Sequence, residues 1–347
     1  MEKIKVAVNG YGVIGKRVAD AVTLQDDMAL IGVCDVVSDW RIKMAVERNF
    51  PVFAFDNLYK KQMIDEGISV KGTLDELIAD ADIVVDCTPK KIAARNIKKY
   101  KTSHLKFIVH GGEKHEVTGH SFSAENNYET AIGRESTRVV SCNTTSILRT
   151  LTALKKAGLL KKARGTLLRR ATDLWESHLG GIINTLVPEK DIPSHQGPDT
   201  KTVDPDLDVV TVAVKVPQTL SHLHYWNVQL TKKTSKEEIL TVLKSSSRIL
   251  LINYEDGLTA NNTIKEWMLA KGRTYGDMYE VALWQDMLKV TDSELFYAYV
   301  VDNQAIVIPE TIDAIRALTG IEKSAERSIK KTNDSLRIPL IENTDQS

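Results

Sequence analysis

Three glycines near the N-terminus constrain the fold of this chain more than any other feature of its sequence. They lie in Gly10-Tyr-Gly12-Val-Ile-Gly15, which directly follows an apolar strand pattern at residues 4–9 and opens an amphipathic helix pattern at residues 15–24. Gly10 permits a tight turn, Gly12 lets the backbone approach a pyrophosphate, and Gly15 lets the helix pack closely on the strand. Free amides at the N-terminus of that helix, together with its dipole, favour phosphate groups. The pattern therefore predicts a dinucleotide cofactor bound at Gly10, Gly12, Val13, Ile14 and Gly15.

An acidic residue at the end of the next predicted strand supports this prediction. Asp35 lies twenty positions after Gly15, where a carboxylate accepts hydrogen bonds from the adenosine ribose and repels a 2′-phosphate. We therefore expect NAD as the cofactor, with NADP possible. Two alternatives stay open at this point: the glycines could serve packing alone, and Asp35 could be a solvated acid at a strand end.

The arrangement of strand and helix patterns predicts an α/β chain. Strands are expected at residues 4–9, 29–35, 83–87, 107–110 and 138–141, with helices between them, which is typical of a parallel sheet with helical crossovers. After about residue 165, strands at 209–216 and 225–231 and helices at 236–244 and 263–271 indicate a mixed or antiparallel sheet. Proline in the first turn predicts a further helix at 309–318.

These patterns predict three segments. Residues 1–140 are expected to form a Rossmann domain that binds NAD(P), and residues 141–308 an α+β catalytic domain. Residues 309–338 are expected to form a C-terminal helix that returns to the Rossmann domain.

The composition excludes several classes of protein. Lys+Arg and Asp+Glu both total 46, so the formal net charge is zero, whereas a nucleic-acid binder usually carries a basic excess. No apolar run approaches the roughly 20 residues of a membrane span, and the N-terminus leads into a strand without a signal peptide. We expect a cytoplasmic protein with no nucleic-acid or membrane partner. Its three cysteines have no disulfide or metal-ligand spacing, so no metal is expected.

The segment Arg138-Val-Val-Ser-Cys142-Asn-Thr-Thr145 carries the strongest chemical signal. An apolar strand delivers Cys142 to the start of a predicted helix, with Thr144 or Thr145 as the expected cap. Positive potential at a helix N-terminus favours the thiolate. Beside a nicotinamide, a thiolate indicates attack on an aldehyde, followed by hydride transfer that leaves an acyl thioester. Cys142 could instead be a small buried hydrophobe, as we expect of Cys34 and Cys87.

The chain resembles the archaeal-type (class II) phosphorylating glyceraldehyde-3-phosphate dehydrogenases from residue 4 to about residue 338. The matching stretches are residues 8–20, 81–89, 111–114, 138–145, 169–173, 193–199, 220–224, 306–310 and 329–333. The resemblance implies reversible oxidation of D-glyceraldehyde 3-phosphate, with inorganic phosphate, to 1,3-bisphosphoglycerate through a cysteine thioester. It also implies a role in glycolysis or gluconeogenesis and a homotetramer.

The resemblance assigns further roles residue by residue. His222 matches the catalytic histidine, expected as the base, although His224 lies two residues on and the sequence alone does not separate the two. Arg169 and Arg170 follow an apolar strand and suit phosphate; the resemblance gives Arg170 to the phosphates of substrate or cofactor. The other substrate-contacting residues implied are Ser141, Asn143, His195 and Gln196. The other cofactor-contacting residues implied are Gly111, Gly112, Asn303 and Gln304, with Asn303 placed for the nicotinamide carboxamide.

This sequence departs from the family pattern at two of these places. Cys34-Asp35-Val36-Val37 stands where the family typically has a Lys-Thr pair suited to a 2′-phosphate, and His195-Gln196 stands where it has two histidines. Two other functions stay open. Aspartate-semialdehyde and N-acetyl-glutamyl-phosphate dehydrogenases also combine a dinucleotide domain with a cysteine nucleophile, and a non-catalytic dinucleotide-binding protein would share the first domain. The long motif match favours the first function.

Overall fold

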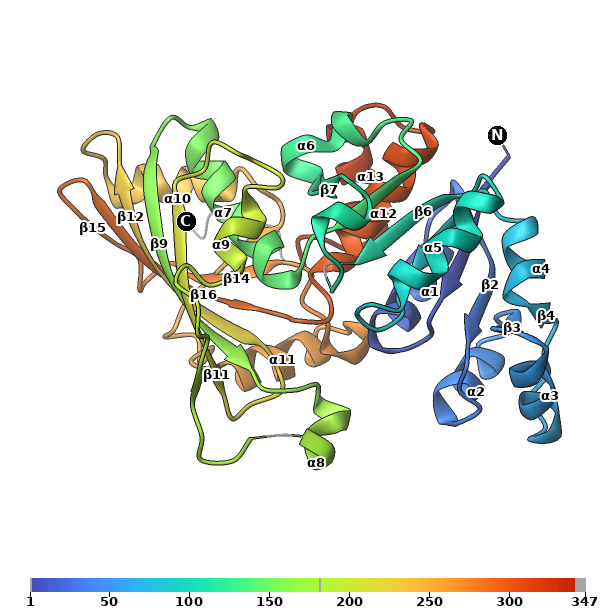
Figure 1. Cartoon of the computed structure of the whole chain (residues 1–347). Coiled ribbons are helices and arrows are strands. Elements are labelled where there is room, and N and C mark those ends of the chain that lie inside the picture. Colours follow the sequence, from blue (N-terminus) through green and yellow to red (C-terminus); the bar gives the residue numbers. More distant parts are fainter. Residues whose placement is uncertain (1, 111, 181, 341–347) are drawn as a thin grey trace. The chain divides into compact units, whose positions relative to one another are not determined.

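The computed structural model describes residues 2–110, 112–180 and 182–340, which form two compact units (Figure 1). The first unit comprises Met1–Ser141 and Val307–Leu336, and the second comprises Cys142–Ile306 and Arg337–Ser347. Each unit holds one large sheet with helices packed against it, so the predicted α/β class is confirmed. No helix within the described ranges is long and apolar enough to cross a membrane.

The first unit is built on a parallel sheet in the order β4-β3-β2-β1-β5-β6-β8-β7. The strands are β1 (Ile4–Asn9), β2 (Met28–Asp35), β3 (Val52–Ala54), β4 (Gly72–Thr73), β5 (Ile83–Asp86), β6 (Lys106–His110), β7 (Ser121–Phe122) and β8 (Ser136–Val139). Val6, Ala7 and Val8 are fully buried, as expected of a strand covered on both faces. The strand order reverses at β1, which has β2 on one side and β5 on the other. Ligands of such sheets bind at the carboxyl ends of the strands at this reversal point.

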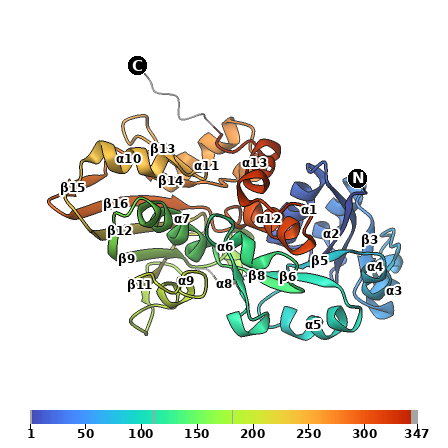
Figure 2. The same cartoon turned by 90° about the horizontal axis from the view of Figure 1, so that it is seen from above.

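Helices connect the strands of the first unit and include two from the end of the chain. They are α1 (Val13–Thr23), α2 (Trp40–Glu47), α3 (Asn57–Asp65), α4 (Leu74–Ala79), α5 (Ala93–Thr102), α6 (Ala124–Ala131), α12 (Val307–Thr319) and α13 (Ala325–Leu336). Figure 2 shows α12 and α13 beside α1 and α6. The buried guanidinium of Arg316 in α12 bonds to Asp27 at 2.8 and 3.0 Å and to Thr332 at 2.7 Å. Because these bonds lie inside the unit, they attach the C-terminal helices to the parallel sheet.

The second unit has a mixed sheet in the order β10-β11-β9-β12-β16-β14-β13, and β15 pairs with β16. The strands are β9 (Leu160–Arg170), β10 (Val187–Pro188), β11 (Val209–Val216), β12 (His222–Leu230), β13 (Ile249–Ile252), β14 (Val281–Trp284), β15 (Lys289–Thr291) and β16 (Glu294–Val301). β9 and β11 are parallel, whereas β12 runs antiparallel to both β9 and β16. The predicted mixed sheet is therefore confirmed.

The helices of the second unit leave one part of this sheet uncovered. α7 (Cys142–Lys156) packs against β9 and β16, and α10 (Lys236–Lys244) packs against α7 and β13. α11 (Asn261–Ala270) packs on Ala282, Ala298 and Val300 of β14 and β16. Grooves of about 560 and 780 Å³ lie along the sheet among the described residues, and Tyr225 and Met287 line both of them. Short helices, among them α8 (Ser177–Gly180) and α9 (Gln196–Thr200), follow β9.

Candidate active site

Cys142 is the first residue of α7. The expectation of a cap at Thr144 or Thr145 is wrong, because the helix has already begun and both threonines are buried in its first turn. The hydroxyl of Thr144 donates instead to the carboxylate of Asp199 in α9 at 2.7 Å. This bond holds α9, which contains Gln196, against the first turn of the helix that begins with Cys142.

Cys142 and His222 lie in contact, although 80 positions separate them. The Nε2 atom of His222 is 3.3 Å from the Sγ atom of Cys142. His222 begins β12, Arg170 ends the neighbouring β9, and the backbone N–H of Arg170 donates to Nδ1 of His222 at 3.1 Å. Burial lowers the pKa of His222 well below its ordinary value, and the nearby His224, Arg170 and Arg169 lower it further. The imidazole is therefore held neutral beside the sulfur.

The pKa of the Cys142 thiol differs in direction from the sequence expectation. Burial raises this pKa, and the positive charges of Arg170 and Arg169, with the backbone N–H of Asn143, offset only part of the rise. A thiolate favoured by the helix N-terminus is therefore not what the structure gives. Burial and nearby carboxylates raise the pKa of Cys34 and Cys87 well above the ordinary value. Among the three cysteines, Cys142 is set apart by the two arginines.

The structure separates the two histidines that the sequence left as alternatives. The Nε2 atom of His224 lies 2.9 Å from Oδ1 of Asn143, and its Nδ1 atom lies 2.9 Å from the hydroxyl of Tyr299. His222 therefore contacts the sulfur, and His224 contacts the amide of the residue after it.

Each of the two predicted arginines is paired with a carboxylate that the sequence analysis did not select. Arg169 bonds to Glu189 at 2.9 Å, and Glu189 also binds the ring of His195. Glu189 was missed because it is twenty positions from Arg169 and no motif includes it. The packing of β10 beside β11 brings it close, since Glu189 N–H donates to Ala213 of β11.

Arg170 bonds to Asp173 at 3.3 Å, within one matching stretch. The same carboxylate accepts hydrogen bonds from the amides of Asn303 and Gln304, at 3.2 and 3.1 Å. Asp173 therefore joins Arg170 to both predicted nicotinamide contacts. Its position three residues after Arg170 in the sequence is a local signal for this ion pair.

Several predicted ligand-binding residues carry buried polar atoms without a hydrogen-bond partner among the described residues. These atoms are both amide atoms of Gln196, Oδ1 of Asn303, and Nε of Arg169 and of Arg170. A buried polar group without a partner is costly and rare in folded proteins. All four residues belong to the second unit, and a polar ligand could satisfy these atoms. Ser141 directly precedes Cys142, at the end of the first unit.

The glycine turn of the first unit fits a dinucleotide. Gly10 has a φ of +92°, and a Cβ on Gly15 would lie 1.8 Å from the carbonyl oxygen of Gly10. Neither position accepts a side chain without movement. Gly12 is the N-cap of α1 without a side-chain hydrogen bond, and a Cβ there would meet nothing within 4 Å. The turn therefore presents the start of α1, with Val13 and Ile14, to open space.

Asp35 stands at the carboxyl end of β2, beside this turn. Its carboxylate accepts hydrogen bonds from the backbone N–H groups of Tyr11 at 2.6 Å and Val36 at 2.7 Å. These bonds fix its orientation and leave lone pairs for further donors. Of the remaining predicted cofactor contacts, Gly112 is exposed after β6 and Gly111 lies outside the described residues. Among the described residues, no cluster of side chains could hold a metal ion.

A dinucleotide turn, together with a Cys-His contact beside two arginines, indicates the class of the NAD(P)-dependent oxidoreductases. Comparison with known proteins agrees with this class. The family described as glyceraldehyde 3-phosphate dehydrogenase, C-terminal domain, matches residues 141–286. The family described as dihydrodipicolinate reductase, N-terminus, matches residues 4–143.

Full-length relatives narrow this class further. A glyceraldehyde-3-phosphate dehydrogenase of Methanococcoides burtonii is 45% identical over 97% of this chain and 100% of its own length. Those of Archaeoglobus fulgidus and Methanothermus fervidus are 43% and 41% identical, over 97% and 96% of this chain and 99% and 98% of their own lengths. The chain belongs to the glyceraldehyde-3-phosphate dehydrogenase family, and its resemblance to the archaeal-type enzymes is confirmed.

Proposed function

We propose that this protein oxidises D-glyceraldehyde 3-phosphate, with inorganic phosphate, to 1,3-bisphosphoglycerate. The observation that carries the proposal is the 3.3 Å contact between Sγ of Cys142 and Nε2 of His222, with two arginines beside it. The names of the relatives support the substrate. We also propose that the reaction belongs to glycolysis or gluconeogenesis and takes place in the cytoplasm, as the family resemblance implies. We also propose residues 1–140 as the cofactor domain, residues 141–308 as the catalytic domain, and residues 309–338 as a C-terminal helix on the first.

Cys142 would form the covalent intermediate. Its thiolate sulfur bonds to the aldehyde carbon, and the carbonyl electron pair moves to the oxygen. A nicotinamide dinucleotide, when bound, would supply the hydride acceptor, and loss of hydride from this carbon would leave a thioester on Cys142. An oxygen of inorganic phosphate then bonds to the thioester carbon, and the sulfur departs as a thiolate. The two half-buried arginines, Arg169 and Arg170, oppose the rise in the pKa of Cys142 that burial causes, so they favour the thiolate at both ends of the cycle.

The backbone fixes the protonation state of His222 and with it the role we propose. The Arg170 N–H can only donate, so Nδ1 of His222 accepts, and the proton of the neutral ring lies on Nε2. Nε2 faces the sulfur. The ring in this state donates to the thiolate and then to the hemithioacetal oxygen, whereas the expected role of base would need a free lone pair on Nε2. We therefore propose that Nε2 of His222 donates a hydrogen bond to these groups, and that the proton of the Cys142 thiol passes to solvent.

Two arginines would bind the phosphate groups. We propose Arg170 as the principal anchor, because its pairing with Asp173 at 3.3 Å is longer than that of Arg169 with Glu189 at 2.9 Å. Gln196, His195, Asn143 and Ser141 would complete the substrate contacts. The buried, unpartnered amide of Gln196 supports its inclusion.

NAD is the cofactor we propose. The glycine turn would hold the pyrophosphate, Asp35 the adenosine ribose, and Asn303 and Gln304 the carboxamide end, with Gly111 and Gly112 also contributing. The carboxylate of Asp35 disfavours a 2′-phosphate by charge repulsion. Arg41, a nearby cation that could offset this repulsion, is bonded to Asp39 at 2.9 and 3.0 Å.

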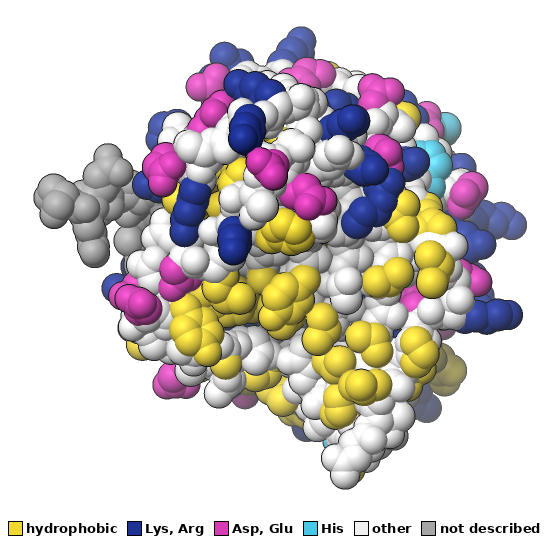
Figure 3. Space-filling view, turned by 90° about the vertical axis from the view of Figure 1, so that its left-hand side faces the viewer, with side chains coloured by type: hydrophobic (Ala, Val, Ile, Leu, Met, Phe, Trp, Pro, Cys, Tyr) yellow, Lys and Arg dark blue, Asp and Glu magenta, His cyan; other side chains and the backbone are white. Residues whose placement is uncertain are grey.

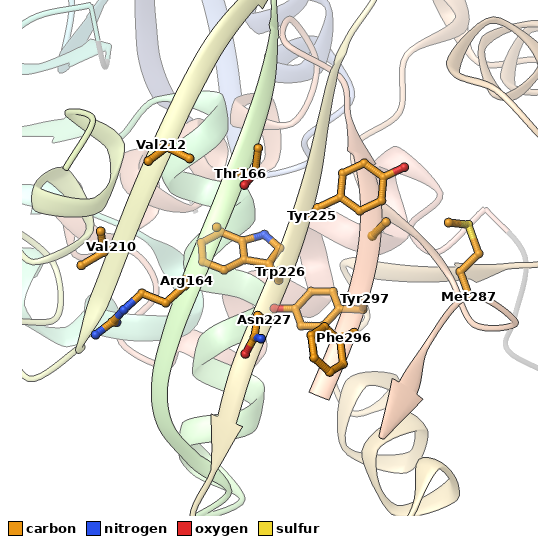
Figure 4. Close-up of a pocket in the computed structure, with 12 residues that line it drawn as sticks. Arg164, Thr166, Val210, Val212, Tyr225, Trp226, Asn227, Met287, Phe296 and Tyr297 are labelled. Carbon is orange, nitrogen blue, oxygen red and sulfur yellow. The ribbon is translucent and has the colours of Figure 1, made fainter. Parts of the chain in front are cut away.

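The exposed apolar face of the second sheet supports self-association, and we propose the homotetramer that the resemblance implies. Hydrophobic side chains gather over a broad area of the surface shown in Figure 3. Tyr225 is 47% exposed, Met287 40% and Phe296 37%. Figure 4 shows Tyr225 and Phe296 on neighbouring strands of the groove there. Exposed apolar surface of this kind marks interaction sites, and two-fold copies bury it against itself.

The assay that tests the proposed reaction follows the absorbance of reduced nicotinamide. Each aldehyde is offered with and without inorganic phosphate: D-glyceraldehyde 3-phosphate, aspartate semialdehyde and N-acetylglutamate semialdehyde. We expect turnover with the first, dependent on phosphate. Preference for either semialdehyde, or cofactor binding without turnover of any of the three, would contradict the proposal.

A further inference from the structure

A buried chain of hydrogen bonds runs from β16 through β12 to the residue after the nucleophile. We propose that His224, held by Tyr299, is a positioning residue that fixes the amide of Asn143 so that its N–H₂ group serves the oxygen of the reacting aldehyde. This inference rests on the proposed function, because it concerns the same reaction.

The three side chains are enclosed and in contact. His224 is fully buried, Tyr299 is fully buried, and Asn143 is 3% exposed. The ring of His224 lies 2.9 Å from Asn143 Oδ1 on one side and 2.9 Å from the Tyr299 hydroxyl on the other. The two ring centroids are 4.9 Å apart. The antiparallel pairing of β12 with β16 sets His224 opposite Tyr299.

The chemistry of these atoms gives each bond a direction. An amide oxygen only accepts, so His224 must carry its proton on Nε2, and Nδ1 accepts from the Tyr299 hydroxyl. Burial, with a smaller effect of Arg169, lowers the pKa of His224 to about 3. The ring is therefore neutral at neutral pH. A neutral imidazole with both nitrogens bonded in this way holds a neighbour but is not free to exchange protons with substrate.

The bond to His224 determines which end of the Asn143 amide remains for a ligand. Oδ1 is occupied, and the backbone carbonyl of Asn143 accepts from the hydroxyl of Ser146 at 2.8 Å. Nδ2 has no hydrogen-bond partner among the described residues, yet it is not one of the buried, unpartnered atoms. It therefore stays accessible, one residue after the sulfur, as a donor for the oxygen that becomes negative when Cys142 attacks.

The experiment is a double-mutant cycle between His224 and Asn143. Removing one preorganised donor to such an oxygen costs about 10²–10³-fold in turnover number. We expect about 10²-fold losses in kcat for Asn143→Ala and for His224→Leu, with the Michaelis constants changed little. His224→Gln, whose amide still donates at the place of Nε2, should stay within about tenfold of the parent. Because both residues act through one amide, the double variant should lose little more than either single variant.

Other measurements keep the test independent of folding and of the substrate assignment. Tyr299→Phe removes only the hydroxyl and should lower kcat without changing the alkylation rate of Cys142 by iodoacetamide. The ¹⁵N spectrum of the imidazole rings, with His224→Gln for assignment, should show His224 neutral and protonated on Nε2. Multiplicative losses in the double variant, an unchanged kcat in His224→Leu, or a proton on Nδ1 would overturn the inference. If the wild type does not turn over D-glyceraldehyde 3-phosphate but His224 is protonated on Nε2 as expected, the proposed function alone would be overturned.

Discussion

The glycine turn of the first unit and the group of contacting side chains around Cys142 in the second unit (the Cys142 cluster: Cys142, His222, Arg170, Asp173 and Asn303) differ in one respect. The residues that contact one another are close in sequence in the turn and far apart in sequence in the cluster. In the turn, Gly10 meets Gly15 five positions on, and Asp35 meets Tyr11. In the cluster, Cys142 meets His222 across 80 positions, and Asp173 meets Asn303 across 130. The turn depends on backbone atoms and the absence of side chains, whereas the cluster depends on side chains delivered by separate strands. Substitutions should therefore affect the two regions by different mechanisms.

Loss of the nucleophile should give the largest effect. Cys142→Ser should lower the turnover number by about 10⁴-fold or more, because a serine hydroxyl beside a donor at Nε2 has no base to activate it. NAD affinity, measured by fluorescence titration, should change little if the turn is an independent region. Cys87→Ala is the matched control and should keep both activity and alkylation at Cys142. Alkylation of Cys34 instead would contradict the assignment.

The two proposed roles of His222 are separated by the choice of replacement. His222→Ala should lower kcat by about 10²–10³-fold, the cost of one donor to a developing oxyanion. His222→Gln keeps an N–H at the place of Nε2 but cannot take up a proton, so it should recover at least tenfold over the alanine variant. Steady-state rates across pH measure both variants. If glutamine is as damaging as alanine, His222 acts as the base after all.

A methyl group in the glycine turn should damage cofactor binding and leave the cluster intact. In Gly15→Ala the new Cβ would lie 1.8 Å from the Gly10 carbonyl oxygen, so the turn must move. Such overpacking costs about 1–3 kcal/mol. We expect a lower melting temperature and a dissociation constant for NAD raised at least tenfold, with the alkylation rate of Cys142 unchanged. A matching loss of thiol reactivity would show that the two regions are not independent.

Asp35 should set the cofactor preference by roughly a factor of ten. Two unit charges about 4 Å apart near a protein surface interact by roughly 4 kcal/mol, and solvent reduces this. Even a third of that energy is close to tenfold, so the wild type should prefer NAD. Asp35→Ala should bring the ratio of kcat/KM for NAD and NADP toward one. Asp35→Asn tests whether charge or shape is responsible. A wild-type preference for NADP would defeat the argument.

Histidines with a lowered pKa should make both units less stable in acid. The loss of stability should be similar in the two units and smaller than the effects predicted above. Burial lowers the pKa of His110 and of His120 to about 4 in the first unit, and that of His224 to about 3 in the second. Unfolded histidines titrate near pH 6.5, so below that pH the unfolded state binds more protons and stability falls. Each histidine contributes at most about 1.4 kcal/mol per pH unit. Urea midpoints between about pH 7.5 and 5 measure this. His120→Gln should reduce the slope.

Self-association offers a separate check on the exposed face. Tyr225→Asp should convert the proposed tetramer to smaller species in sedimentation experiments, while Leu58→Asp, at another exposed apolar position, should not. A wild type that sediments as a monomer would contradict the homotetramer.

The sequence by itself determined the α/β class, the parallel and mixed sheets, the glycine turn and the family. These features follow from local patterns: strand and helix periodicity, glycines where a Cβ has no room, and long motifs in a fixed order. Cys142 and His222 could be named from those motifs. The contact between Cys142 and His222 could not be predicted from the motifs. Nor could the different roles of His222 and His224, because residues two apart on a strand share one face and only the neighbouring elements distinguish them.

Tertiary structure alone decided the protonation and charge of the site. The Arg170 N–H that fixes His222 comes from the pairing of β9 with β12, and Glu189 reaches Arg169 only through β10. Burial, which no local pattern measures, reversed the expected direction of the Cys142 pKa. Desolvation and hydrogen-bond direction depend on every element packed around a group. The sequence therefore identifies the chemical groups of this site, and the packing of strands and helices sets the state in which each group works.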